Sequence, residues 1–346
     1  MPAHAPQDSS LPVPDPSSSA RQASNGLGTE PSAELSTELS ASVPSRQLAV
    51  ADSFRTRVRA DVTEVRGLAL HLARFRQSAI EALSEVEPLL EVFPNPQAPA
   101  SADSRPNLDS NTVSNALDEF LTEALERIDA AGEGFPRLEL WQTSPALGKQ
   151  AAQEAPGTQA AQQAGSAQPP QQVPSVQLVP GWELSVALRP LPVIRDSIEL
   201  RTAPLPASLV SPARKGPNIA VYSEIARSLG CEGLLVDADG AVIEGTTTSL
   251  VWWDAAGRGF VAASTQRVPS VAEALVAREA RSLGAPLMPA TVTPDQLVGR
   301  DVWAVNALHG IRPVRSIDGQ ALTVHDAGRL ARFRLALDGT WEPVRP

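Results

Sequence analysis

The sequence predicts an α/β (α+β) fold in two domains, and three observations lead to this expectation. The chain has 346 residues, more than one average domain. Hydrophobic residues make up 42% of it, as in a globular protein with a sizeable core. Segments with a two-residue apolar period alternate with segments of helical period. We expect a small N-terminal domain over residues 47–190 and a larger C-terminal domain over residues 191–340, because prolines at positions 190 and 192 suit a link.

Three stretches lack any apolar period. Residues 1–46 are rich in Ser, Pro, Ala and Gln, and we expect them to form a disordered tail. Residues from about 93 to 111 contain four prolines, and residues from about 144 to 177 consist largely of Ala, Gln and Pro; we expect both to be low-complexity inserts. Because loop-closure entropy grows slowly with loop length, such inserts need not interrupt the fold.

In the N-terminal domain the clearest signals are two amphipathic helices. Apolar residues recur at i, i+4, i+7, i+11 and i+15 and predict a helix over residues 68–83. A second helix can be capped by Ser110 or Thr112, carries a continuous apolar stripe and ends before Gly132. The strands that we expect in this domain are residues 48–58, 137–142 and 182–189.

In the C-terminal domain the strongest local signal is Asp239-Gly240, which lies between two β-rich runs and predicts a hairpin. A helix is expected over residues 218–229, ended by Gly230. Another begins near residue 271, where Pro269 is acceptable. The remaining expected elements are strands at residues 197–202, 233–236, 241–243, 246–253, 258–262, 302–305 and 313–317, and a terminal helix at residues 327–337.

Charge and composition exclude several classes of function. The net charge is −10, and the segment from Glu85 to Glu133 alone carries −9, since it contains eleven acidic residues and two arginines. This charge argues against nucleic acid or an anionic membrane surface as a partner. One cysteine and four scattered histidines leave no disulfide framework and no metal cluster. No apolar run is long enough to span a membrane, and no signal peptide is visible. We therefore expect a cytoplasmic enzyme.

Lys215 and Glu244 are the residues whose types suggest chemistry. All but two of the 29 basic residues are arginine, and the two lysines are Lys149, in the second insert, and Lys215. A chain so rich in arginine would use arginine where charge alone was needed, so Lys215 indicates a need for an amine that can form a Schiff base. Glu244 is expected at the end of a strand. From residue type alone, a loop lysine and an exposed glutamate remain open alternatives.

A series of motifs surrounds these two residues. Lys215 is followed by a short helix, a strand, the hairpin Asp237-Ala238-Asp239-Gly240, a strand and Glu244-Gly245-Thr246-Thr247. This order resembles that of the class IV aminotransferases. Further matches are an early Leu70-His71-Leu72-Ala73-Arg74-Phe75, similar to His-Leu-x-Arg-Leu, and a late strand and turn at residues 301–314. The family consists of pyridoxal-phosphate enzymes and includes branched-chain and D-amino-acid aminotransferases and aminodeoxychorismate lyase. The resemblance covers most of residues 47–320.

The resemblance implies a pseudo-barrel in the C-terminal domain, pyridoxal 5'-phosphate bound between the domains, a homodimer and no metal. Lys215 would carry the cofactor and act as the catalytic base, and Glu244 would pair with the pyridine nitrogen. Arg74 would contact the phosphate together with the free backbone amides of Val271 and Ala272 at a helix start. The substrate would be an amino acid or aminodeoxychorismate.

Several positions depart from the family pattern and leave alternatives open. Arg55 stands where the motif Phe-Glu-Thr has glutamate, and Ser249 where asparagine is usual; Ser270, Ala272 and Glu273 replace residues of Leu-Pro-Gly-Ile-Thr-Arg. One alternative is therefore an inactive fold that serves as a binding or assembly module. For an active enzyme, Asn306-Ala307-Leu308 favours the lyase, which releases pyruvate and 4-aminobenzoate for folate biosynthesis, over an aminotransferase. Arg312 is either a surface residue or a ligand of the substrate carboxylate.

Overall fold

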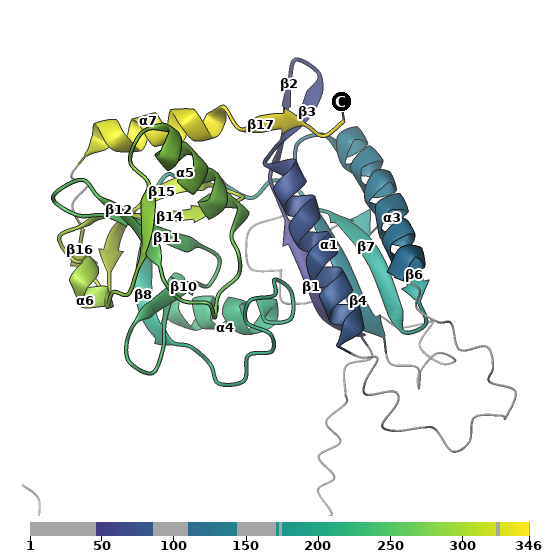
Figure 1. The fold of residues 1–346 in the computed structure, drawn as a ribbon, viewed down its shortest axis with the longest axis horizontal. Helices are drawn as coiled ribbons and strands as arrows, with labels where there is room; N and C mark the ends of the chain where they lie inside the picture. Colours follow the sequence, from purple (N-terminus) through teal and green to yellow (C-terminus); the bar gives the residue numbers. More distant parts are fainter. Residues whose placement is uncertain (1–45, 86–109, 144–170, 173–174, 323–325, 346) are drawn as a thin grey trace, which may run out of the picture. The chain divides into compact units, whose positions relative to one another are not determined.

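The computed structural model describes residues 46–85, 110–143, 171–172, 175–322 and 326–345, which carry three β-sheets (Figure 1). The tail expected over residues 1–46 lies outside the described residues except for Arg46. Most of the inserts expected over residues 93–111 and 144–177 also lies outside them. Among the described residues, no helix is both long enough and apolar enough to cross a membrane.

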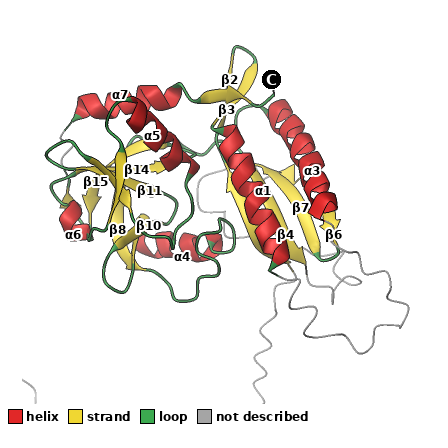
Figure 2. Cartoon of the chain, in the orientation of Figure 1, coloured by secondary structure: helices red, strands yellow, loops and turns green. Residues whose placement is uncertain are grey.

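A five-stranded antiparallel sheet and two helices form the N-terminal part. Helices α1 (Leu68–Ser84) and α3 (Ser110–Ala131) lie side by side on one face of the sheet (Figure 2). Leu138 and Leu140 point from the sheet into this layer and are fully buried with Phe75 of α1, as the helix periodicity requires. The strand order is β1 (Arg46–Ser53), β4 (Arg137–Thr143), β7 (Trp182–Leu188) and β5 (Gln171–Gln172), and β6 (Val176–Val179) also pairs with β7.

Two expectations for this part need correction. Strand β5 and the first half of β6 fall within the insert expected over residues 144–177, and both strands pair with β7, whose edge would otherwise carry unpaired backbone groups. The single strand expected over residues 48–58 is divided into β1 and β2 (Thr56–Arg59). The second half turns back through Ala60 and Asp61, both at positive φ, to pair with β3 (Val62–Arg66).

A nine-stranded sheet forms the C-terminal part and curls on itself. Its strand order is β10-β9-β8-β15-β14-β11-β12-β13, with β16 added to β15. The edge strand β10 approaches the segment that follows β13, where the Val242 amide donates to the Val292 carbonyl at 2.8 Å, so the sheet curls into a pseudo-barrel. The bounds are β8 (Ile198–Pro204), β9 (Glu232–Val236), β10 (Val242–Gly245), β11 (Ser249–Trp253), β12 (Gly259–Ala262), β13 (Leu287–Ala290), β14 (Asp301–Asn306), β15 (Gly310–Ile317) and β16 (Gln320–Ala321).

Side chains of the curled sheet are buried on both faces. In β11, Leu250 and Trp252 point into the barrel, whereas Val251 and Trp253 point outward. The outer face is covered by α5 (Val271–Ser282) and α7 (Ala327–Asp338), and α4 (Ile219–Leu229) packs near β9 (Figure 1). Trp253 lies 5.2 Å from the ring of Phe333 of α7. Helices α5 and α7 thus cover the outer side of β11, β14 and β15, and α4 covers β9, the strand that pairs with the one carrying Glu244.

The C-terminus returns to the N-terminal part. Strand β17 (Trp341–Pro343) pairs with β3 in a three-stranded sheet of order β17-β3-β2, and Val344 belongs to the N-terminal core. Neither β17 nor the short helix α6 (Pro294–Leu297) was predicted, although Thr293 and Gln296 form a capping box with Pro294 at the first helical position. The domain boundary expected at residues 190–191 stays a prediction.

Candidate active site

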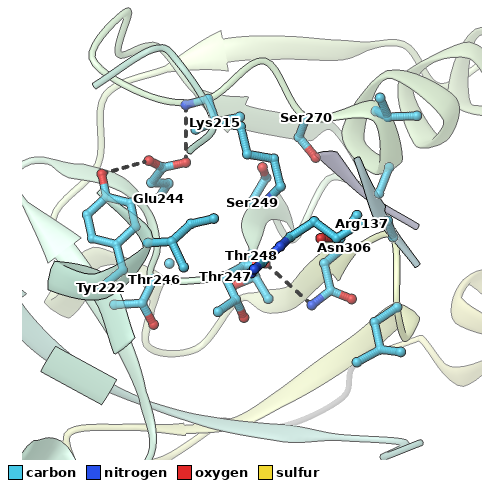
Figure 3. Close-up of a pocket in the computed structure, with 18 of the residues that line it drawn as sticks. Arg137, Lys215, Tyr222, Glu244, Thr246, Thr247, Thr248, Ser249, Ser270 and Asn306 are labelled. Atoms are coloured by element: carbon cyan, nitrogen blue, oxygen red, sulfur yellow. Dashed lines mark hydrogen bonds between the residues drawn. The ribbon is translucent and has the colours of Figure 1, made fainter. Parts of the chain in front are cut away.

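The five residues that the sequence singles out line one cavity of about 290 Å³. Lys215 comes from the segment before α4, and Glu244 from the end of β10 (Figure 3). Arg74 belongs to α1, and Val271 and Ala272 to the start of α5. Four elements far apart in sequence therefore bring an amine, an acid, a guanidinium and a helix N-terminus to the same space.

Lys215 is held by its backbone against strand β1. The Ala51 amide donates to the Lys215 carbonyl at 2.8 Å. Gly216 has φ of 144°, and a Cβ there would lie 2.6 Å from the Cα of Val50, so only glycine permits this close approach. Burial lowers the pKa of Lys215, and the charge of Arg74 lowers it further, against the opposing effects of Asp52 and Glu244. The backbone of Lys215 is thus fixed in place, and its amine is easier to deprotonate than that of a free lysine.

Glu244 is a buried carboxylate whose hydrogen bonds are long. Its side chain is 5% exposed, accepts the Tyr222 hydroxyl at 3.4 Å and accepts the Val268 amide at 3.3 Å. Burial raises its pKa from 4.5 to about 7, although the Val268 amide and Lys215 act in the opposite direction. The pKa of Tyr222 is raised in turn by burial and by the nearby carboxylate. The negative charge of the ionised Glu244 is thus only partly stabilised by the groups around it, and a cation would stabilise it further.

The turn after Glu244 is fixed by Glu232 of β9. The Glu232 carboxylate accepts the Thr247 amide at 2.6 Å, the Thr247 hydroxyl at 2.8 Å and the Thr248 hydroxyl at 3.1 Å. A Cβ at Gly245 would lie 2.3 Å from Oγ1 of Thr248. The strand expected over residues 246–253 therefore begins only at Ser249, because these contacts hold residues 246–248 in a turn.

The start of α5 presents free backbone amides to the cavity. The Ser270 hydroxyl caps the helix by accepting the Glu273 amide at 3.2 Å, and the amides of Val271 and Ala272 have no partner within the helix. Both guanidinium Nη atoms of Arg267 bind the Glu273 carboxylate, at 2.6 and 2.8 Å. The acid at position 273 is therefore neutralised by an arginine and does not oppose an anion at this helix end.

Arg74 joins the helix start to a buried acid. Its Nε and Nη2 donate to the two carboxylate oxygens of Asp52, each at 2.8 Å, and its Nη1 donates to the Pro269 carbonyl at 2.8 Å. The His71 ring lies 2.7 Å from the same carboxylate. Burial alone would raise the pKa of Asp52, but Arg74 and His71 hold it below its usual range. Asp52 thus fixes the guanidinium beside the first turn of α5.

Two residues of the cavity were not predicted from the sequence, and the position of a third residue was predicted wrongly. Tyr222 and Arg189 both line it. Tyr222 is the single tyrosine of the chain, seven positions after Lys215, so its rarity could have drawn attention to it. For Arg189 no such signal exists. Arg312, expected at the surface or at the substrate, is 4% exposed and is not among the described residues that line the cavity, because it lies in the central strand β15.

Comparisons with known proteins give a family and a fold. A family model described as amino-transferase class IV matches residues 53–317. Among solved structures, a branched-chain amino acid aminotransferase from the organism abbreviated T.th., complexed with N-(5'-phosphopyridoxyl)-L-glutamate, is 20% identical, with a TM-score of 0.58 over 86% of this chain and 89% of that chain. The branched-chain enzyme of Escherichia coli is 17% identical, with a TM-score of 0.57 over 84% of each chain. A PLP-bound hypothetical aminotransferase from Mycobacterium tuberculosis is 17% identical, with a TM-score of 0.50 over 84% and 88%.

No curated protein matches the chain. The structural likeness confirms the α/β fold with a pseudo-barrel that the sequence resemblance implies.

Proposed function

Since the chain belongs to the class IV aminotransferase family, whose cofactor is pyridoxal 5'-phosphate, we propose that it is an active enzyme in which Lys215 carries that cofactor. Glu244 is the proposed partner of the ring nitrogen. Arg74 and the amides of Val271 and Ala272 are the proposed phosphate ligands. The observation that carries the proposal is that Lys215 and the partly compensated carboxylate of Glu244 line the same cavity.

The residues of the cavity fit the chemical groups of this cofactor. A protonated ring nitrogen would give the buried Glu244 carboxylate the cation that its long hydrogen bonds do not supply. Free amides at the start of α5 suit a phosphate, as does the positive end of the helix dipole. Arg74 lies beside the same turn through its bond to the Pro269 carbonyl. These contacts support a site that has one end for the ring and another for the phosphate.

The proposed mechanism follows from the protonation of these groups. When bound, pyridoxal phosphate supplies an electron sink for the bond that breaks at the substrate Cα. The lowered pKa of Lys215 increases the neutral fraction of Nζ, which can then accept the Cα proton and return it. The Glu244 carboxylate holds the proton of the ring nitrogen, and the Tyr222 hydroxyl and the Val268 amide orient that carboxylate.

The chain offers a matched control for the cofactor attachment because it has only two lysines. The purified protein should show a visible absorption band with pyridoxal phosphate. Borohydride reduction followed by peptide mapping should place the pyridoxyl group on Lys215. Lys215→Ala should lose the band and the adduct, whereas Lys149→Ala should keep both. A colourless protein that takes up no added cofactor would instead favour the binding or assembly module.

Aminotransferase activity is the reaction that the family supports, and one observation favours a second candidate. Asn306-Ala307-Leu308, the sequence form typical of aminodeoxychorismate lyase, lines the cavity. The Asn306 side chain accepts the His309 amide at 2.8 Å and donates to the Thr247 carbonyl at 3.4 Å, so the turn is tied to the segment after Glu244. We therefore keep 4-amino-4-deoxychorismate lyase, which gives 4-aminobenzoate, as the alternative.

The two reactions differ in their need for an acceptor. Release of pyruvate from aminodeoxychorismate without an added 2-oxo acid would identify the lyase. Amino-group transfer from an amino acid that depends on a 2-oxo acid would identify the aminotransferase. The homodimer and the cytoplasmic location stay predictions; light scattering of the purified protein tests the first.

A further inference from the structure

A separate cavity of about 180 Å³, here called the arginine cavity, lies outside the candidate active site and is lined by arginines from three parts of the chain. Arg66 comes from β3, and Arg195 from the segment before β8. Arg334 comes from α7, which leads into the strand that pairs with β3 (Figure 1). His309 lines both this cavity and that of the candidate active site.

Two aspartates also line the arginine cavity, but only one of them is paired with an arginine there. Asp338 accepts Nη2 of Arg66 at 2.6 Å. Arg334 is held by neutral groups, since its Nε donates to the Ile311 carbonyl at 3.1 Å and its Nη2 to the Asp196 carbonyl at 2.9 Å. Among the described residues, neither Arg334 nor the Asp196 carboxylate forms an ion pair.

Arg66 has donors that the protein does not use. Its side chain is 14% exposed, and its Nε and Nη1 are buried without a hydrogen-bond partner. Its guanidinium stacks 4.4 Å from the Trp341 ring, and Arg57 and Arg55 lie 4.2 and 5.8 Å from the same ring. Burial lowers the pKa of Arg66, and Asp338 opposes this effect. The charges of Arg55 and Arg57 lower that pKa further, so one aspartate does not neutralise this side of the cavity.

The pKa of His309 reflects the charge around the cavity. Burial, together with the positive charges of Arg312, Arg195 and Arg55, lowers this pKa to about 4, and no described acid offsets them. The ring is therefore neutral at pH 7. Its Nδ1 accepts the Arg195 amide at 3.2 Å, so Nε2 carries the proton and is a hydrogen-bond donor. At this position the arginines thus outweigh the two aspartates.

Arg195 is the arginine of the cavity that has no structural partner. Its side chain is exposed and forms no hydrogen bond or ion pair within the part of the chain that the structure describes. All five of its N–H donors are therefore available at the cavity. The Nη1 group of Arg334 and Nε2 of His309 likewise have no described acceptor.

We propose that the arginine cavity binds a small dianion of the phosphate class, held by Arg195, Arg334 and His309 beside the positive charge of Arg66. A phosphate has oxygens on all sides and can accept bonds from donors on separate elements, whereas a carboxylate is matched by a single planar fork. The anion would also stabilise the largely desolvated guanidinium of Arg66. This site is independent of the proposed function, although His309 joins the two cavities.

Calorimetric titration of inorganic phosphate into the cofactor-loaded full-length protein tests this site, because the cofactor then occupies the proposed phosphate ligands at Arg74 and α5. The wild type should bind phosphate, sulfate should compete, and acetate at the same ionic strength should not. Arg195→Gln should weaken phosphate binding by roughly 10-fold, since a charge-assisted hydrogen bond is lost, and Arg195→Glu should weaken it more. Because Arg195 has no described partner, both variants should keep the melting temperature of the wild type.

Arg332→Gln is the matched control. Arg332 lies on α7 two positions before Arg334, is exposed and is not among the described residues that line the arginine cavity. Its loss therefore removes the same charge without removing a ligand. If Arg195→Gln binds phosphate as tightly as the wild type, or if both variants weaken binding equally, Arg195 is not a ligand of the anion.

Proton NMR of the histidine rings gives a second readout. A bound anion should raise the pKa of His309, because it offsets the charges of the neighbouring arginines. His309→Gln identifies the signal among those of the four histidines. At one phosphate concentration the rise should appear in the wild type and in Arg332→Gln but be smaller in Arg195→Gln. A pKa that phosphate does not move in the wild type contradicts the proposed site.

Two further comparisons identify the ligand. Binding of methyl phosphate as well as inorganic phosphate would support a phosphate ester at this site, and binding of inorganic phosphate alone would support the free ion. If the wild type is a dimer in phosphate-free buffer and Arg195→Gln is a monomer, the arginine binds a second copy of the chain, which overturns the proposal. A protein that takes up no cofactor contradicts only the proposed function, since the variants can then be compared in its cofactor-free form.

Discussion

Replacing Glu244 with glutamine should stabilise the cofactor-free protein and weaken cofactor binding. Glutamine has the same shape as a protonated glutamate, and its amide can donate to the Tyr222 hydroxyl while its carbonyl accepts the Val268 amide. It carries no charge at any pH. The variant therefore removes the burial of an ionised carboxylate and keeps the hydrogen-bonding geometry.

The size of the effect follows from the pKa of Glu244. A rise from 4.5 to about 7 is a difference of about 2.5 (7 − 4.5), which at about 1.36 kcal/mol for each pKa unit corresponds to about 3 kcal/mol. Because the folded-state pKa is raised, the associated stability is fully present below pH 4.5 and is lost as the pH rises through about 7. The variant and the wild type should therefore differ little near pH 4.5 and by about 3 kcal/mol at pH 8.

Urea unfolding of the cofactor-free protein at pH 4.5 and pH 8, followed by tryptophan fluorescence, measures this difference. Glu139→Gln is the matched control, since Glu139 is also buried but is bound by Arg137, Trp141 and Ser185. That control should destabilise the protein at pH 8. If Glu244→Gln is no more stable than the wild type at pH 8, burial of the ionised Glu244 carboxylate does not destabilise the folded protein. With cofactor present, Glu244→Gln should bind it roughly 10- to 100-fold more weakly, because a charge-assisted hydrogen bond is lost.

Three further substitutions probe the supports of the site. Gly216→Ala should weaken cofactor binding and destabilise the fold by roughly 2 kcal/mol or more, since it combines a backbone clash with positive φ; urea unfolding compares it with Gly230→Ala, which has positive φ but open space and should cost roughly 1 kcal/mol. Asp52→Asn should cost about 3 kcal/mol at pH 7, because it leaves a buried cation unpaired. Since the folded-state pKa of Asp52 is lowered, that difference should shrink as the pH falls below about 4 in the same assay. Tyr222→Phe removes a donor to Glu244 and should move the pH midpoint of the stability loss above about 7; an unchanged midpoint would mean that the hydroxyl does not act on the carboxylate.

The sequence could predict the parts of the fold that depend on local pattern. The helix over residues 68–83 was predictable because its apolar period is long and regular, and the hairpin at Asp239-Gly240 because its turn requires those residue types. Strand β17 could not be predicted, since three residues have no period and their pairing with β3 depends on where the preceding helix ends. Strands β5 and β6 could not be predicted either, because the segment around them consists largely of Ala, Gln and Pro and shows no apolar period.

The site shows the same division between local and long-range information. Lys215 could be found because lysine is rare in this chain, and Tyr222 could have been found in the same way. Arg189 could not, because 27 of the 29 basic residues are arginines and nothing local distinguishes this one. Its distinction is the lack of a carboxylate partner among the described residues, a property of the fold that appears only when strands far apart in sequence are assembled.

Glu139 and Glu244 illustrate why the sequence identifies residue types but not their roles. Both are buried glutamates on strands of sheets. Glu139 has an arginine, an indole and a hydroxyl as donors at 2.5 to 3.0 Å, so its charge is compensated within the protein. Glu244 has two donors beyond 3.2 Å and a raised pKa, so the groups around it stabilise its ionised form only in part. Such a carboxylate suits the proposed pairing with the ring nitrogen of the cofactor, because a protonated ring nitrogen would supply the missing counter-charge.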